Sequence, residues 1–161
     1  MEDLSRRNVL AIGVAAACAC CLAETSPLLA DDDERRPTGP APKSVQIGKL
    51  DDFPKAGFYD TFRKQRVMVS KLDDRLVVMS AICTHKGCLV KIDQAQADQL
   101  QCPCHKAEFS DQGTATKGPA KVSLVRYAVK QGADGTITAD LTKSFEERHW
   151  DDAAAFIPLK K

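Results

Sequence analysis

The sequence predicts an all-β domain, and two observations carry that prediction. Between residues 44 and 141, short apolar segments alternate with polar residues at a period of two, which is the spacing of a strand with one buried face. Gly and Asp residues separate these segments, as they do in the turns between antiparallel strands. Aromatic residues make up only 6% of the 161 residues, so we expect a small, aliphatic core.

The expected strands follow one another along this region. In chain order they are residues 44–50, 66–72, 75–82, 89–92, 99–101, 122–129 and 136–141. The second and third flank a turn at Asp73 and Asp74, and the last two flank the glycine-containing residues 132–135. Both arrangements predict a β-hairpin, because short polar or glycine turns between apolar strands favour antiparallel pairing.

Residues 1–30 have the layout of an export signal. Two arginines in the motif S-R-R-N-V-L precede an uncharged run, residues 9–23, that is shorter than the roughly 20 residues of a membrane-spanning helix. The motif resembles a twin-arginine signal, and cleavage is expected after Ala23 or Ala30. Lipid attachment to an early cysteine is an alternative. We therefore expect an exported protein, periplasmic or at the periplasmic face of the membrane, with the N-terminal segment as a route to membrane association.

Composition divides the rest of the chain into three parts. Residues 31–43 read DDDERRPTGPAPK and predict an extended, proline-rich linker. The folded domain is expected at 44–143. Residues 144–161, rich in charge and alanine, are expected to be a C-terminal tail or a short helix. The 23 basic and 22 acidic residues lack the basic excess of nucleic-acid-binding proteins, so no nucleic-acid partner is expected.

Two short segments hold most of the potential metal ligands. Residues 83–88 read C-T-H-K-G-C and residues 102–105 read C-P-C-H, which places four of the seven cysteines and two of the three histidines within 23 positions. Two thiols and two imidazoles in these segments suit a metal site of the kind that binds zinc, namely Cys83, His85, Cys102 and His105. Cys88 and Cys104 would then be free to form a disulfide if the loops meet. Two plain disulfides are the remaining interpretation, and His149 is expected to be an ordinary surface residue.

These motifs resemble those of Rieske [2Fe–2S] proteins of the disulfide-containing type, and the resemblance extends over about residues 44–141. Gly118-Pro119-Ala120 is similar to the proline loop of that family. The resemblance implies three small antiparallel sheets with the cluster-binding loops at one tip, and a disulfide between Cys88 and Cys104. It also implies that Cys83 and Cys102 bind the inner iron of a [2Fe–2S] cluster. His85 and His105 would bind the outer iron.

The sequence departs from many high-potential relatives at three positions. Ala107 and Phe109 replace a serine and a tyrosine whose hydroxyl groups donate hydrogen bonds to the cluster and its ligand sulfur. Each missing bond is expected to lower the reduction potential by roughly 65–130 mV. Lys86 stands where relatives from quinol-oxidising complexes have leucine in an apolar docking tip. That lysine favours electrostatic docking to an acidic partner.

The resemblance implies one-electron transfer as the iron–sulfur subunit of an exported or membrane-associated oxidoreductase similar to quinol:cytochrome c reductases. The redox partner would be a cytochrome b or cytochrome c type protein or a catalytic oxidoreductase subunit, and the chain would have no substrate site of its own. The alternatives are a stand-alone periplasmic Rieske carrier, the small subunit of an arsenite-oxidase-like enzyme, the ferredoxin of an aromatic-ring dioxygenase, and a zinc-binding module without redox activity.

Overall fold

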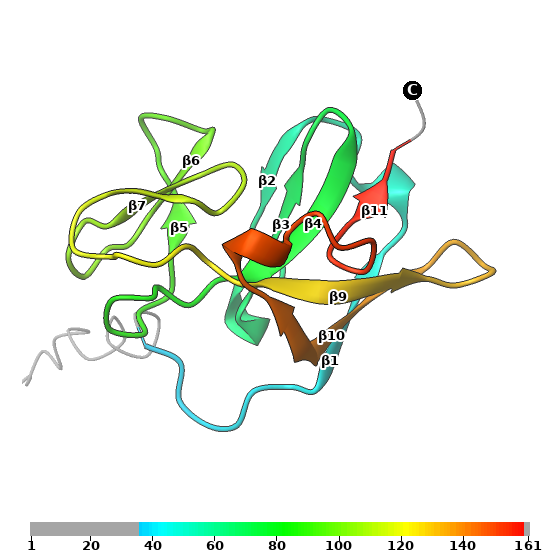
Figure 1. Cartoon of the computed structure of the whole chain (residues 1–161), viewed down its shortest axis with the longest axis horizontal. Coiled ribbons are helices and arrows are strands. Elements are labelled where there is room, and N and C mark those ends of the chain that lie inside the picture. The colour runs from blue at the N-terminus through cyan, green and yellow to red at the C-terminus, as the bar shows by residue number, and fades with distance from the viewer. Residues whose placement is uncertain (1–35, 160–161) are drawn as a thin grey trace, which may run out of the picture.

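The computed structural model describes residues 36–159, and its regular secondary structure consists almost entirely of short antiparallel strands (Figure 1). The strands are β1 (Ser44–Gly48), β2 (Gly57–Tyr59), β3 (Val67–Lys71), β4 (Arg75–Ser80), β5 (Lys91–Ile92), β6 (Gln99–Gln101), β7 (Glu108–Ser110), β8 (Ala115–Lys117), β9 (Arg126–Gln131), β10 (Ile137–Phe145) and β11 (Ile157–Pro158). The all-β prediction is confirmed. The expected export segment lies outside the described residues, and no helix within residues 36–159 is long and apolar enough to span a bilayer.

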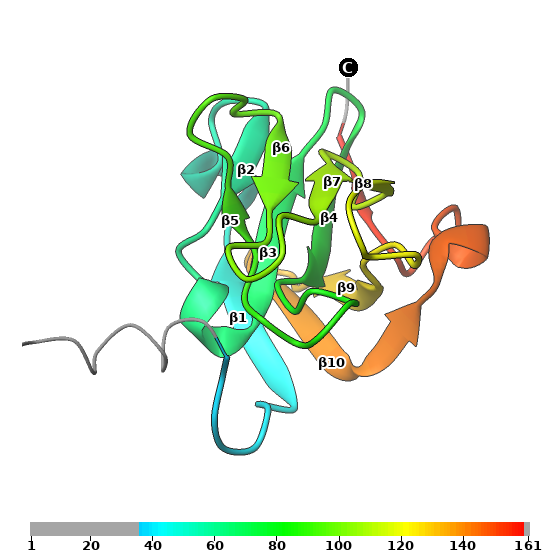
Figure 2. The same ribbon diagram turned by 90° about the vertical axis from the view of Figure 1, so that its left-hand side faces the viewer.

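The strands form two hydrogen-bonded sheets. Seven belong to the large sheet, with the order β1-β10-β9-β4-β3-β2 and with β11 added beside β4. The other four form the small sheet β5-β6-β7-β8, which lies to one side of the large sheet (Figures 1 and 2). The expectation of three sheets is corrected, because the pair Met79–Arg126 joins β4 to β9 and so merges two groups of strands into one sheet.

The hairpin of β3 and β4 is buried on both faces and so connects two hydrophobic cores. Val69 and Val78 face the core of the large sheet, whereas Met68 and Met79 face the core beneath the small sheet. Alternate residues of a strand point to opposite faces, so a strand buried on both sides reads as a continuous apolar run. The loops of the small sheet therefore rest on the same hairpin that forms the centre of the large one.

The C-terminal segment extends the domain instead of forming the expected tail. β10 continues to Phe145, past the expected boundary at residue 143, and is followed by one turn of 3-10 helix, η3 (Glu147–His149). Two similar turns, η1 (Leu50–Asp52) and η2 (Arg63–Gln65), occur earlier in the chain. β11 then pairs with β4 and buries Ile157 in the core of the large sheet. Burial of this apolar side chain holds the segment to the sheet.

A buried arginine secures this C-terminal segment. Arg126 is 1% exposed, and its guanidinium lies 4.2 Å from the centroid of the Trp150 ring. The same group donates hydrogen bonds to the carbonyl oxygens of Gln112, at 3.2 Å, and of Trp150, at 3.5 Å. Burial, reinforced by the nearby charge of Arg75, lowers the pKa of Arg126 to about 10, which leaves it protonated at neutral pH. The cation–π contact is thus charged under physiological conditions.

We expect the Arg126–Trp150 contact to show a coupling free energy of about 1 kcal/mol toward folding. The measurement is a double-mutant cycle with Arg126→Met, Trp150→Leu and the double variant, followed by urea unfolding. Methionine preserves much of the packing volume while it removes the charge. Strictly additive effects would contradict a direct contribution of the contact to stability.

Candidate metal centre

Three loops meet at one end of the small sheet, and two of them carry the predicted ligands. The first loop, residues 83–88, lies between Ile82 and Leu89, which pair with one another in an isolated β-bridge. The second loop, residues 102–107, connects β6 to β7. The third follows β8. The antiparallel order of the small sheet places all three loops at the same end, as the sequence resemblance implied.

The two ligand loops close through the same pair of backbone hydrogen bonds. In the first, the amide of Cys83 donates to Cys88 at 2.8 Å, and the amide of Gly87 donates back to Cys83 at 2.9 Å. In the second loop, the amide of Cys102 donates to the carbonyl of residue 107 at 2.8 Å, and that of Lys106 donates to Cys102 at 3.0 Å. Both loops therefore present their first cysteine at the same point of an equivalent turn.

Each turn requires one residue in the left-handed region. Gly87 has φ of 75° and meets this requirement without steric cost. Lys106 occupies the equivalent position of the second loop with φ of 56°, which is unfavourable for a residue with a side chain. The second loop is therefore held in a conformation that its own sequence does not favour, and contacts from outside the loop must stabilise it.

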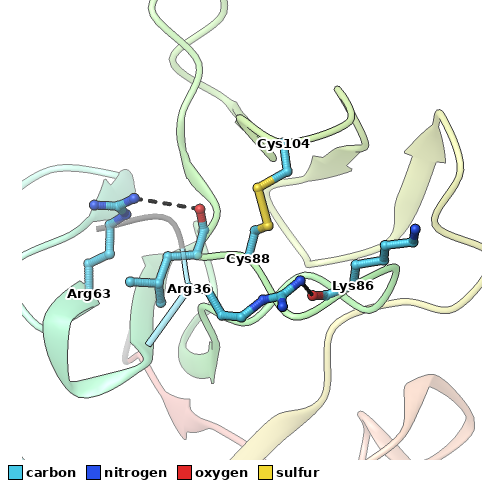
Figure 3. Close-up of a disulfide and its surroundings, with 6 residues drawn as sticks. Arg36, Arg63, Lys86, Cys88 and Cys104 are labelled. Atoms are coloured by element: carbon cyan, nitrogen blue, oxygen red, sulfur yellow. Dashed lines mark hydrogen bonds between the residues drawn. A yellow bond between two sulfur atoms is a disulfide. The ribbon is translucent and has the colours of Figure 1, made fainter. Parts of the chain in front are cut away.

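One such contact is the disulfide between Cys88 and Cys104, which joins the two ligand loops (Figure 3). Its sulfurs are 2.08 Å apart, and its Cα atoms lie 6.5 Å apart. The sulfur of Cys102 lies within 4.8 Å of both bonded sulfurs. Because Cys88 and Cys104 are joined to one another, neither offers a thiolate to a metal, and the remaining thiols of the two loops are those of Cys83 and Cys102.

These two thiols are almost completely buried and interact with one another. Cys83 is 2% exposed and Cys102 is 1% exposed. Burial raises the pKa of the Cys83 thiol, and the neighbouring Cys102 raises it further, while the backbone amides of His85 and Lys86 act in the opposite direction. An isolated buried thiol stays protonated, whereas coordination to a metal releases the proton. The pair is thus arranged to become two thiolates only when a metal is bound.

The two imidazoles lie beside each other at the surface of the same end. The ring centroids of His85 and His105 are 4.7 Å apart, with the rings perpendicular. Nδ1 of His85 is buried and has no hydrogen-bond partner within residues 36–159, which is unusual for a polar atom and typical of a nitrogen that binds a metal. Burial, with the nearby charges of His105 and Lys86, lowers the pKa of His85. The ring is therefore neutral at pH 7, the form in which imidazole binds metals.

The donor set fits a [2Fe–2S] group of the type that takes two thiolates and two imidazoles. Two adjacent buried thiols face the protein interior, and two adjacent imidazoles lie toward solvent. The structure thus places Cys83 beside Cys102 and His85 beside His105, and it places His149 at the surface, in the C-terminal segment.

The third loop packs closely against the second. Gly118 has φ of 87°, and a Cβ atom at this position would lie 2.8 Å from the carbonyl oxygen of Lys106 and 2.9 Å from Cα of Ala107. Only glycine therefore permits this approach of the two backbones. The hydroxyl of Thr84, from the first loop, donates a hydrogen bond of 2.6 Å to the carbonyl of Val122. All three loops are thus fixed to one another.

Two arginines outside the motifs hold the first loop, and the sequence analysis missed them. Arg63 donates from Nε to the carbonyl of Val90 at 2.7 Å, and it also contacts the carbonyl of Leu89 (Figure 3). Arg36, in the expected linker, donates to the carbonyl of Lys86 at 3.2 Å. An arginine that caps distant carbonyl groups leaves no periodic pattern in the sequence, so no signal could have identified these residues.

Comparison with known proteins agrees with this geometry. Residues 43–130, more than half of the chain, match the family described as "Rieske [2Fe-2S] domain". The cytochrome b6-f complex iron-sulfur subunit of Chlorobaculum tepidum is 38% identical over 98 residues, which cover 60% of this chain and 53% of that protein. The ubiquinol-cytochrome c reductase iron-sulfur subunit of Rickettsia typhi is 37% identical over 62 residues, or 38% of this chain and 35% of that protein.

One solved structure is also similar. It is the cyanobacterial plasma membrane Rieske protein PetC3 from Synechocystis PCC 6803, with 30% sequence identity and a TM-score of 0.47, and the match covers 59% of this chain and 97% of that one. The chain spans about half the length, or less, of the curated relatives it matches.

Proposed function

This chain belongs to the Rieske [2Fe–2S] domain family, and from that premise we propose that it transfers single electrons as the iron–sulfur subunit of a quinol:cytochrome c reductase-like oxidoreductase. The observation that carries the proposal is the pairing of two adjacent buried thiols with two adjacent imidazoles at one end of the small sheet. The ligands we assign are Cys83, His85, Cys102 and His105. A cytochrome b or cytochrome c type protein would be the redox partner.

The residues around the site have separate roles in this proposal. A [2Fe–2S] group with two imidazole ligands accepts and releases one electron at a potential between about −150 and +300 mV. Cys83 and Cys102, being buried, would hold it away from water. The amides of His85 and Lys86 that approach the Cys83 sulfur would stabilise negative charge there. His105 is exposed and would be the ligand nearest to a docked partner.

The cellular location is part of the same proposal. The motif S-R-R-N-V-L and the uncharged run after it support export through the twin-arginine route, which carries folded proteins. The Cys88–Cys104 disulfide supports an oxidising compartment, because such bonds persist outside the cytoplasm. We therefore assign the domain to the periplasm or to the periplasmic face of the membrane.

A second candidate function is a stand-alone periplasmic carrier, or the small subunit of an arsenite-oxidase-like enzyme. The observation that favours it is the exposed Lys86, which directly follows the assigned ligand His85 at the tip. A charged side chain there weakens apolar docking into a membrane subunit and suits docking to a soluble protein.

Two measurements test the proposed function. Electron paramagnetic resonance of the reduced protein should show the anisotropic signal of a Rieske cluster, and a metal analysis that found only zinc would overturn the proposal. Purification from native membranes and periplasm then distinguishes the two candidates. A co-purifying cytochrome b supports the reductase subunit, whereas a molybdenum-containing subunit, or the absence of any partner, supports the second candidate.

We expect Ala107→Ser and Phe109→Tyr each to raise the reduction potential by roughly 65–130 mV. Both side chains are fully buried in the core that also contains the assigned ligands Cys83 and Cys102, and neither has a hydroxyl group. A hydroxyl that donates to a charged acceptor would stabilise the reduced, more negative state by about 1.5–3 kcal/mol. Protein-film voltammetry measures the shift, and Phe58→Tyr, at a partly buried phenylalanine of β2, is the control. An unchanged potential in both variants would contradict the assignment of these positions.

A further inference from the structure

Charge is unevenly distributed over the part of the chain that carries the site. Residues 83–125 contain five lysines, no arginine and four acidic residues. All five lysines belong to the three loops, or to the strand ends next to them, namely Lys86, Lys91, Lys106, Lys117 and Lys121. Sheet pairing aligns the strand ends in one row, because Lys91 lies opposite Gln101, Gln101 opposite Glu108, and Glu108 opposite Lys117. We call these five residues the lysine rim.

Three of the four acidic residues lie at the opposite end of the small sheet. Asp93 and Asp98 lie in the turn between β5 and β6, and Asp111 lies in the turn between β7 and β8. Asp98 and Asp111 also line a cavity of about 500 Å³ together with Asp73, Asp74 and Lys71, at the junction with the large sheet. The small sheet is therefore positive at the end that carries the loops and negative at the opposite end, an arrangement that orients a charged partner before contact.

The lysine rim is largely uncompensated. Lys117 forms an ion pair of 3.1 Å with Glu108, the one acidic residue at this end of residues 83–125. Lys106 donates only to the neutral side chain of Gln101, at 3.3 Å. Neither Lys86 nor Lys121 forms an ion pair within the described residues, and both are exposed. Their charge is thus directed to solvent around the two imidazoles.

The tip also carries an exposed apolar side chain. Val122 is 61% exposed, while its carbonyl is held by Thr84 in the first ligand loop. This side chain is therefore presented from a loop that is fixed relative to the histidines. A small apolar contact within a charged rim is the pattern of a docking surface that is steered by charge.

We infer that the lysine rim is the docking surface for a redox protein with an acidic patch around its own redox centre. This inference rests on the proposed function and names the partner class that it requires. Two of its lysines, Lys86 and Lys106, directly follow His85 and His105 in the ligand loops, so a protein bound to the rim lies beside the assigned ligands of the outer iron. An anionic lipid surface would place nothing there that exchanges electrons, and one exposed valine provides little area for insertion into a bilayer.

Charge reversal of the two unpaired lysines tests the inference on the cluster-loaded protein. The variant carries Lys86→Glu and Lys121→Glu, and the matched control carries Lys55→Glu and Lys130→Glu. Both control lysines are exposed and lie outside the lysine rim. Lys55 precedes Ala56, which lines the cavity, and Lys130 lies in β9. Both variants change the net charge by the same amount. Stopped-flow oxidation by an acidic and by a basic c-type cytochrome, from about 10 mM to 1 M salt, gives the second-order rate constants.

At low salt, the second-order rate constant with the acidic cytochrome is expected to fall about 10- to 1000-fold in the rim variant and to stay unchanged in the control. The fall should disappear at high salt, and the wild type should react faster with the acidic cytochrome than with the basic one. Isothermal titration calorimetry should show the same loss of binding to the acidic cytochrome. The resonance spectrum should stay that of the wild type. Because Lys86 adjoins the assigned ligand His85, reversal of its charge should lower the reduction potential, which by itself favours oxidation by the cytochrome, so a fall in the rate constant reports docking.

Four results would overturn the inference and leave the proposed function standing. The rate constant could fall equally in the control variant, or not fall in the rim variant. The wild type could react faster with the basic cytochrome, or the lysines could be needed for binding to vesicles of anionic lipid and have no effect on the reaction with the cytochrome. A wild-type protein that shows no Rieske signal, and does not exchange an electron with ascorbate and ferricyanide, would instead overturn the proposed function and the inference with it.

Discussion

Replacing His105 with glutamine is expected to lower the iron content of the purified protein at least about tenfold and to abolish the Rieske resonance signal. Loss of a residue that hydrogen-bonds to a metal ligand already lowers metal affinity about 10- to 100-fold. Loss of the ligand itself should therefore have at least as large an effect. His105 lies at the surface, with its ring 4.7 Å from that of His85, so the change should leave the packing of the core intact. Iron and acid-labile sulfide analysis measure the outcome.

His149→Gln is the matched control for this experiment. His149 is also exposed, but it lies in η3 of the C-terminal segment and not in a ligand loop. It should keep its iron and its spectrum. Circular dichroism should show the same β-sheet content in both variants, because the His105 variant is expected to lose metal rather than fold. A His105 variant that kept the Rieske signal would refute the assignment of this ligand.

Removal of the disulfide is the second large effect that we expect. Cys88→Ala with Cys104→Ala should lower the free energy of unfolding by about 3 kcal/mol, because the bond closes a loop between positions 16 residues apart. This corresponds to a fall of about 10 °C in the melting temperature of a domain of this size. Urea unfolding of the metal-free variant and of the metal-free wild type gives the difference directly.

The same variant should also hold iron less firmly. The bond joins the two ligand loops, and the second loop contains Lys106 in a left-handed conformation that the turn demands. Without the bond, that loop loses its covalent tie to the first loop and keeps its closing hydrogen bonds and the contact with Gly118. We expect faster release of iron to a chelator. Reduction of the wild-type bond by dithiothreitol should reproduce both effects, and an unchanged unfolding free energy would contradict the role given to the bond.

The strands that the sequence predicted are those with a clear alternation or an evident turn. The hairpin around Asp73 and Asp74 appears as β3 and β4, and the hairpin around residues 132–135 appears as β9 and β10. The sequence did not reveal β2, β7 and β8, because a segment of three residues gives only a weak period-two signal, and of the three-residue strands β6 alone was predicted. β11 was missed for the same reason, and its place beside β4 depends on contacts between distant parts of the chain.

The candidate site was easier to predict than the fold around it. The spacing of cysteine and histidine in residues 83–88 and 102–105 indicated two loops of candidate ligands, and the structure places Cys83 beside Cys102 and His85 beside His105. The interactions that hold the loops in place were not predictable. The hydrogen bond from Thr84 to the third loop and those from Arg63 to the residues after the first loop join positions that are 26 to 38 apart. Only the folded chain brings these groups together.

The pairing of the large sheet has a consequence for the order of folding during synthesis. Ser44 pairs with Asp140, and Leu76 with Ile157, so the large sheet cannot close until residues as far as Ile157 have left the ribosome. The four strands of the small sheet, in contrast, pair only with neighbours in the sequence. Local pairings form faster than distant ones, since the loop that must close is shorter. The loops that carry the site can therefore meet early, whereas the scaffold beneath them is completed last.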